Sequence, residues 1–346
     1  MSDGERLLLF LALIYLSDCL LWVDRRTVLF ASGTGGRWRA VVADYLWGNS
    51  SGRLFLLNPL PPLGFLFRAR LMPVSISPTS IVAYNAQTVG NSGRPPQSGR
   101  TAEIAPGAEF SHDGPGLVVD GRPFCDMGDA GAARGLADLL NRIKGLDAAG
   151  REQAILGFWR ERLGLRGTKE RIRAALEACR QERLACSLAF FLFFAVLPLL
   201  AFRFGVGVAV LAGAAAMLFS AAVVCAVYLS CQRRHFPESR DGLWGDLAKM
   251  MLCPPTAIRA CDLVMEKMSP RLDALPLAAL LLRGADREAF LKGYLADLEA
   301  PAFPDDIPDA VRETCLWQNR AIVKTGVAAI PGLGRFAHAA DCRMAS

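Results

Sequence analysis

The feature that most constrains this chain is an apolar stretch, residues 184–232, in which Arg203 is the only charged residue. As one straight helix, its 49 residues would extend about 73 Å, whereas the hydrocarbon core of a bilayer is about 30 Å thick. The stretch must therefore fold back on itself. Arg203, followed by Gly205 and Gly207, marks the expected turn.

This turn divides the stretch into two predicted transmembrane helices, Ala185–Phe202 and Gly207–Cys231. Pro198 lies late in the first helix and is expected to kink it, because proline removes a backbone donor and clashes with the preceding turn. The composition agrees with lipid-embedded segments, since 52% of residues are hydrophobic, only 21% are charged and the mean hydropathy is +0.27.

A third predicted span is Leu7–Val23, which has eight leucines and a single charge at Asp18. Its 17 residues are near the lower limit for crossing a bilayer. A cleaved signal peptide is the alternative. The preceding segment MSDGER is not positively charged, and no A-x-A-like site follows, so we favour a retained span.

The arginines and lysines beside the spans predict the orientation. Residues 24–183 carry 22 basic and 15 acidic residues, whereas only Arg6 precedes the first span and only Arg203 lies in the turn. We therefore expect a multi-pass protein of the inner (cytoplasmic) membrane with its amino terminus outside. Both soluble regions are expected in the cytoplasm. Four of the ten cysteines lie in or at the spans and the other six in these cytoplasmic regions, and all are expected to be free thiols.

The predicted fold class is an α-helical integral membrane protein with a small β-rich module and a helical carboxy-terminal region. Short β-branched and aromatic runs between turn residues predict strands in residues 27–125, with Asp120-Gly121 as a hairpin turn and Pro123 on an edge strand. Asp129, Asp147 and Thr168 are expected to begin helices. The full division is residues 1–26 (first span), 27–125 (β-rich module), 126–183 (helical segment), 184–232 (transmembrane hairpin) and 233–346 (helical region).

Two features within the spans are candidate functional residues. Asp18 is an ionisable residue inside a predicted span, which makes it a candidate by default, although a packing or polar-contact role is the alternative. Small residues recur on neighbouring stripes of the last span and predict close helix packing, either within the hairpin or in a homodimer. These residues are Ala212, Gly213, Ala216 and Ser220.

The sequence contains no recognisable catalytic motif. It lacks G-x-S-x-G, H-E-x-x-H and kinase-type patterns, and Gly33–Gly36 lacks the Lys-Ser/Thr of a phosphate-binding loop. The Cys and His spacings match no usual zinc site, so we expect neither a metal nor a cofactor. The diffuse positive charge does not predict nucleic-acid binding.

The leading interpretation is a non-catalytic membrane-anchored scaffold or regulatory component. Its expected partners are the lipid bilayer and either another protein or a second copy of the chain. One alternative is a membrane enzyme acting on a lipid or envelope precursor, with a site built from Asp44, His112, Asp113 and Asp126. Another is a small transport or channel subunit, which would need an oligomer to supply a polar pathway.

Overall fold

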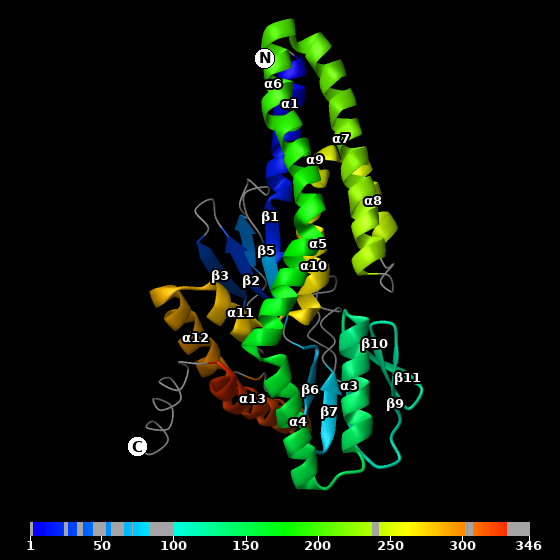
Figure 1. Cartoon of the computed structure of the whole chain (residues 1–346), viewed down its shortest axis with the longest axis vertical. Helices are drawn as coiled ribbons and strands as arrows, with labels where there is room; N and C mark the ends of the chain where they lie inside the picture. The colour runs from blue at the N-terminus through cyan, green and yellow to red at the C-terminus, as the bar shows by residue number, and fades with distance from the viewer. Residues whose placement is uncertain are drawn as a thin grey trace.

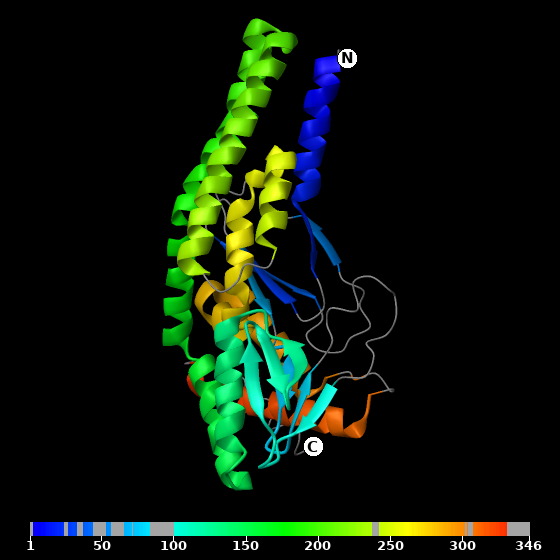
Figure 2. The same cartoon turned by 90° about the vertical axis from the view of Figure 1, so that its right-hand side faces the viewer.

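The computed structural model is an elongated molecule with long helices at one end and small sheets and shorter helices at the other (Figures 1 and 2). It describes residues 3–23, 27–32, 37–43, 53–56, 66–70, 72–83, 100–236, 242–301, 303 and 307–330. Asp44 and the glycines at 33–36 lie outside these ranges.

The helical end contains a hairpin, as the uncharged stretch predicts. Helix α5 (Leu165–Phe191) continues through a π-helical turn at Leu192–Val196 into α6 (Leu197–Phe204). Gly205, with φ of +78°, then separates α6 from the returning helix α7 (Val206–His235). The π turn directly precedes Pro198, which fits a proline that cannot donate to the helix ladder.

The first predicted span is wrong in its last third. Helix α1 ends at Asp18 (Asp3–Asp18), and Leu20–Val23 forms strand β1 instead. Strand β1 pairs antiparallel with β4 (Arg53–Leu56), so its backbone groups find partners outside a helix. Pairing with a distant segment is not visible in local hydrophobicity, which is continuous through this region.

The other end, called the sheet end below, contains three antiparallel sheets of three strands each within the described residues. The first, in the order β3-β2-β5, consists of β2 (Thr27–Ser32), β3 (Trp38–Ala43) and β5 (Leu66–Arg70). The second, in the order β6-β7-β8, consists of β6 (Val74–Ile76), β7 (Ser80–Ala83) and β8 (Arg100–Glu103). The third, in the order β11-β10-β9, consists of β9 (Phe110–Asp113), β10 (Gly116–Val119) and β11 (Arg122–Asp126).

The third sheet confirms the hairpin prediction. Asp120 and Gly121 have φ of +50° and +70°, the pair of positive values that a tight two-residue hairpin turn requires. Pro123 lies in β11, an edge strand, where its missing backbone donor breaks no ladder in the middle of the sheet.

Two helices then cover this sheet region and lead to the hairpin. Asp129 caps α3 (Ala130–Ile143), and Asp147 caps α4 (Ala148–Arg162), each accepting a hydrogen bond from a backbone N–H in the first turn, as predicted. Helix α5 begins at Leu165 rather than at Thr168. The Thr168 hydroxyl instead donates to Gly164 O at 3.0 Å, within the first turn of the helix.

Where the structure describes it, the region after the hairpin is helical, as predicted. Thr256–Met268, expected as one helix, is instead divided between Pro254–Ala257 and Ala260–Met268. The elements are α8 (Leu243–Leu252), α9 (Pro254–Ala257), α10 (Ala260–Met268), a 3₁₀ turn (Ser269–Arg271), α11 (Ala274–Leu281), α12 (Gly284–Glu299) and α13 (Asp309–Ala329).

These carboxy-terminal helices pack against the amino-terminal strands. Phe30 of β2 and Phe290 of α12 have ring centroids 5.6 Å apart. Gln318 of α13 bonds to strand β6, accepting from Ile76 N at 2.7 Å and donating to Val74 O at 3.4 Å. Its amide thus satisfies backbone groups of β6 as a neighbouring strand would. One contiguous apolar core extends from Tyr15 in α1 to Ile330 after α13.

Candidate functional site

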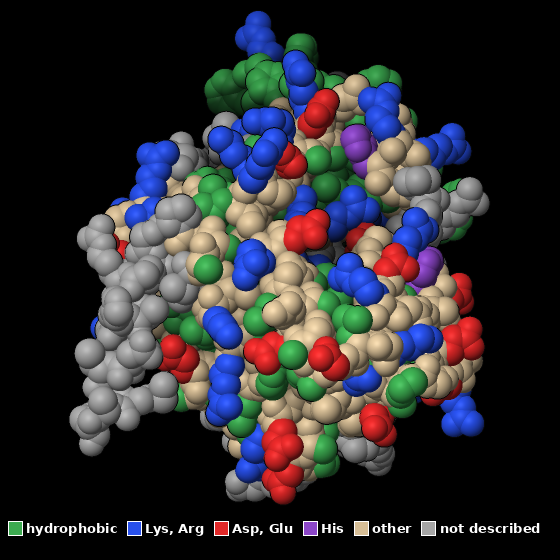
Figure 3. All heavy atoms as spheres, turned by 60° about the horizontal axis from the view of Figure 1, so that its bottom comes forward, with side chains coloured by type: hydrophobic (Ala, Val, Ile, Leu, Met, Phe, Trp, Pro, Cys, Tyr) green, Lys and Arg blue, Asp and Glu red, His purple; other side chains and the backbone are tan. Residues whose placement is uncertain are grey.

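Exposed large apolar side chains are concentrated at one end of the described structure. Elsewhere in the described ranges such side chains are Leu20 and Leu146, and Figure 3 shows the sheet end with acidic and basic side chains interspersed. The exposed apolar set is Leu9, Phe10, Leu13 and Leu16 of α1; Leu184, Leu188 and Phe191 of α5; Phe194, Leu199, Phe202 and Phe204 next along the chain; Leu211, Leu218 and Phe219 of α7; and Trp244, Met251 and Leu252 of α8.

Two helices in this end are long and apolar enough to cross a bilayer, Leu165–Phe204 and Leu211–His235. The two helices contact each other at both ends of the pair. Cys231 Sγ lies 3.4 Å from Ala178 O, and Gly213 faces Leu197. The charge-free part of the first helix, Leu184–Phe202, extends about 28 Å, close to the thickness of a hydrocarbon core.

Helix α1 lies beside the same segment. The Tyr15 ring is 4.7 Å from that of Phe194 and 6.2 Å from that of Phe193, so its level along the hairpin is fixed by aromatic contacts. From Tyr15 the helix continues about 18 Å toward its amino terminus, which lies near the hairpin turn (Figure 2).

Asp18 lies at the foot of α1 rather than in its middle. The positive charges of Arg259 and Lys249 act on its carboxylate. Arg259 itself is buried and forms an ion pair with Asp262, and its Nη1 lies 3.4 Å from Cys19 Sγ. The structure thus places Asp18 in a cluster with cationic groups where the apolar surface ends.

The four small residues of α7 do not share one environment. A Cβ on Gly213 would lie 1.9 Å from Leu197 Cδ1, so the glycine allows the hairpin to close. Ser220 is also buried, and its hydroxyl donates to Met217 O at 2.9 Å. Ala216 is half-buried and Ala212 is exposed. The buried pair therefore packs inside the chain, and Ala212 faces outward.

A layer of polar contacts lies directly below the apolar segment. The Tyr228 hydroxyl of α7 donates to Asp246 Oδ2 of α8 at 2.7 Å. Lys267 of α10 lies 3.3 Å from the same carboxylate oxygen and donates to Gln232 Oε1 at 3.2 Å. These contacts join α7, α8 and α10 at the foot of the hairpin.

Glu182 of α5 is a buried acidic residue in the same layer. Its side chain is fully buried, and neither carboxylate oxygen has a hydrogen-bond partner. It lies one turn below Ala185, the first residue of the predicted span. Burial raises the pKa of this carboxyl to about 8, so the neutral form predominates at pH 7.

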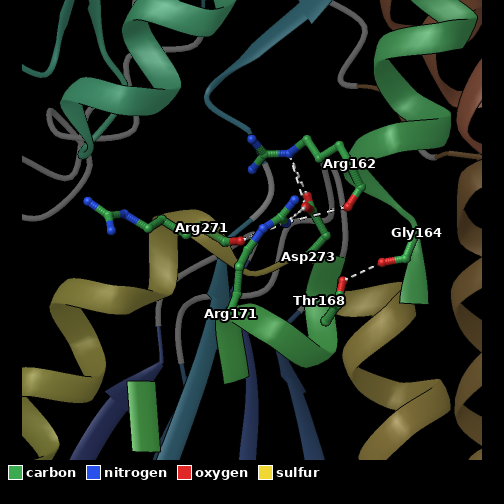
Figure 4. A network of polar contacts seen from close by, with 6 residues as sticks. All are labelled: Arg162, Gly164, Thr168, Arg171, Arg271 and Asp273. Carbon is green, nitrogen blue, oxygen red and sulfur yellow. Dashed lines mark hydrogen bonds and ion pairs between the residues drawn. The ribbon is translucent and has the colours of Figure 1, made fainter. Parts of the chain in front are cut away.

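A second polar cluster fixes the base of α5 (Figure 4). The Asp273 carboxylate lies 3.0 Å from Arg162 Nε and 3.9 Å from Arg171 Nη1. Arg171 also donates to Arg271 O at 3.0 Å. Burial lowers the pKa of the Arg171 guanidinium, and the Asp273 charge opposes that shift. The cluster joins α4, α5 and the start of α11.

Asp129 extends this joint to α3. One of its oxygens caps α3 through Ala132 N at 2.9 Å, while the other accepts from Arg271 Nε at 2.9 Å. Charged contacts therefore connect the base of α5 to helices that precede the hairpin in sequence and to helices that follow it. Sequence reasoning identified Asp129 only as a cap, because Arg271 is 142 residues away.

The described residues of the enzyme alternative, His112, Asp113 and Asp126, do not lie near the apolar end. Asp113 and Asp126 are exposed and lie opposite Gly116 on the two neighbouring strands. His112 Nε2 accepts from Arg134 Nε at 3.3 Å. Their sheet lies at the sheet end (Figure 1). Within the part of the chain that the structure describes, no three His, Cys, Asp or Glu side chains are grouped to hold a metal ion.

Comparisons with known proteins identify no relative: no family model, curated protein or solved structure matches this chain.

Proposed function

We propose that this chain is a membrane-anchored scaffold in which α1, α5–α6 and α7 cross the bilayer and both soluble regions lie in the cytoplasm. The amino terminus and the Gly205 turn are then external. In this proposal the protein is not an enzyme, and it positions a protein partner, or a second copy of itself, at the inner membrane surface.

The observation that carries the proposal is the concentration of exposed large apolar side chains at one end of the described structure. Phe202 is 91% exposed and Leu211 is 79% exposed, a costly arrangement in water for side chains of this size. In a bilayer the same side chains would contact acyl chains. The length of the apolar segment supports the same interpretation.

The distribution of basic residues supports the orientation. Arg173, Arg180, Arg233 and Arg234 are exposed at the foot of the hairpin, whereas Arg203 is the charge near its tip. Basic residues accumulate on the cytoplasmic side of membrane helices.

The scaffold role rests on the mechanical continuity of α5. This helix extends from the Asp273 cluster to the hairpin tip with a single π turn, so the soluble region is held at a fixed angle to the membrane segment. Asp113 and Asp126 of the enzyme alternative are exposed and distant from the apolar end, and Asp18 at the foot of α1 gives a transport pathway little polar lining.

Thiol labelling on intact cells tests the orientation. Native Cys125 and Cys315 are poor reporters, because burial raises the pKa of Cys125 to about 12 and Cys315 is buried. We therefore suggest Phe204→Cys at the tip and, as matched exposed positions, Ala149→Cys and Ala285→Cys. A membrane-impermeant maleimide should label only Phe204→Cys before lysis. External labelling of Ala149→Cys or Ala285→Cys would refute the orientation.

The scaffold role is tested by chemical cross-linking of the full chain in native membranes, followed by purification. We expect one stoichiometric protein companion or a dimer of the chain, retained after high-salt washing. Recovery of the chain as an uncross-linked monomer from membranes would contradict this role and would leave the anchoring proposal intact.

A further inference from the structure

Helix α8 has two apolar faces, of which only one is covered by protein. Leu243 and Met250 point into the core. On the other face Trp244 is 79% exposed, Leu252 is 86% exposed and Met251 is also exposed, with exposed Ala248 between them along the helix. Their spacing of four, three and one residues forms one stripe of the helix surface.

Contacts with the hairpin fix the depth of this stripe. Cys225 Sγ of α7 lies 4.0 Å from Leu247 O, and Cys186 Sγ of α5 lies 3.5 Å from Ala257 O. Because Ala185 begins the predicted span, Leu247 and Ala257 lie near the inner edge of the hydrocarbon core. Trp244 lies three residues before Leu247, about 5 Å along the helix axis on the side away from the core, and Leu252 lies five residues beyond it, about 8 Å toward the core.

The exposed charges at the same level are mostly positive. Arg233 and Arg234 are exposed in the last turn of α7, Arg180 is exposed on α5, and Lys249 is exposed on α8 itself. Asp246, the acid of α8, is turned toward Tyr228 and Lys267. A stripe with a tryptophan at one end, aliphatic side chains at the other and arginines nearby suits an anionic headgroup layer over acyl chains.

We propose that the outer face of α8 binds the anionic phospholipids of the leaflet that faces the soluble region. Trp244 lies among the headgroups, Met251 and Leu252 contact the outermost acyl carbons, and Arg233 and Arg234 bind lipid phosphates. This inference rests on the proposed membrane insertion. It adds a lipid-binding element that is continuous with the apolar surface of the hairpin.

Fluorescence quenching tests the position of α8. The full chain would be reconstituted into nanodiscs of phosphatidylcholine and phosphatidylglycerol, with the phosphatidylcholine brominated near the headgroup end of its acyl chains. The chain has six tryptophans. We expect Trp244→Phe to remove most of the quenchable emission. Trp159→Phe, at a buried position of α4, should leave that emission unchanged.

Lipid composition tests the preference for anionic lipid. Phosphatidylglycerol should be enriched in the lipid that copurifies from mixed vesicles. The change of Arg233 and Arg234 to Gln should lower its relative affinity about fivefold per arginine. The matched control is the change of Arg142 and Arg160 to Gln, two exposed arginines of α3 and α4, which should have no effect. Equal enrichment in both double variants would overturn the assignment to anionic lipid.

Failure of this inference differs from failure of the membrane proposal. If the protein resists alkaline extraction but Trp244 is not quenched, α8 is covered by a second copy or another protein, and the lipid contact is refuted. If alkali extracts the protein, membrane insertion itself is refuted, and the α8 inference with it.

Discussion

Glu182 illustrates how a single residue couples the packing of the hairpin to pH. Its carboxyl has no hydrogen-bond partner, and burial raises its pKa from the ordinary 4.5 to about 8. Between these values the folded protein binds a proton that the unfolded chain releases. The contribution of this group to stability therefore falls as pH rises from about 4.5 to 8, and it is constant above that range.

We predict that Glu182→Met stabilises the protein at pH 7 by roughly 3 kcal/mol, because folding no longer requires the uptake of a proton. The thermal midpoint in detergent, measured from pH 5 to 8.5, should rise and lose most of its slope with pH. Glu177→Met, at an exposed position on the same helix, serves as the control. Identical pH profiles for wild type and Glu182→Met would contradict the assignment.

Sequence reasoning missed Glu182, although a signal was present. Cys179, Glu182 and Cys186 are spaced three and four residues apart, and all three are buried on one face of α5. The arginines between them indicate a charged flank of the span, which obscures the buried face. Asp273 gave no comparable signal, because its partner Arg162 is 111 residues away and only the tertiary fold brings them together.

At the scale of elements, local rules predicted the caps of α3 and α4, the Asp120-Gly121 hairpin and the Gly205 turn. Each depends on residues within one turn of each other. Strand β1 was mistaken for helix because its partner β4 is about 30 residues away. Strands β5, β6, β8 and β9 were not predicted either. Strand β8 pairs with β7 from about 20 residues away, which no local pattern shows.

The close approach of α6 and α7 leads to a second prediction, which concerns the stability of the hairpin. Gly213→Val should destabilise it by about 1–3 kcal/mol, because the new side chain would overlap Leu197 and force repacking. Ala212→Val, one residue earlier and exposed, should have little effect. Thermal unfolding in detergent compares the two. Equal midpoints would show that the α6–α7 contact is looser than the structure indicates.

At the scale of the whole molecule, the regions that precede and follow the hairpin in sequence pack against each other. Val82 of β7 is buried against Val311 and Cys315 of α13. Ser80 and Thr314 are linked by a hydroxyl–hydroxyl hydrogen bond of 2.7 Å. Removal of the carboxy-terminal helices would expose this apolar surface and leave the Gln318 contacts on β6 unmade.

We therefore predict that residues 27–163 do not fold when produced alone. The isolated fragment should aggregate or exchange its amide hydrogens within seconds, whereas the full chain should protect β6, β7 and α13 together. Co-production with residues 242–346 should restore a soluble complex, since the two parts supply opposite sides of one core. The restoring fragment carrying Gln318→Ala should bind more weakly, because two backbone groups of β6 lose their partners. A monomeric, protected fragment 27–163 would instead show that the β-rich region is an independent domain.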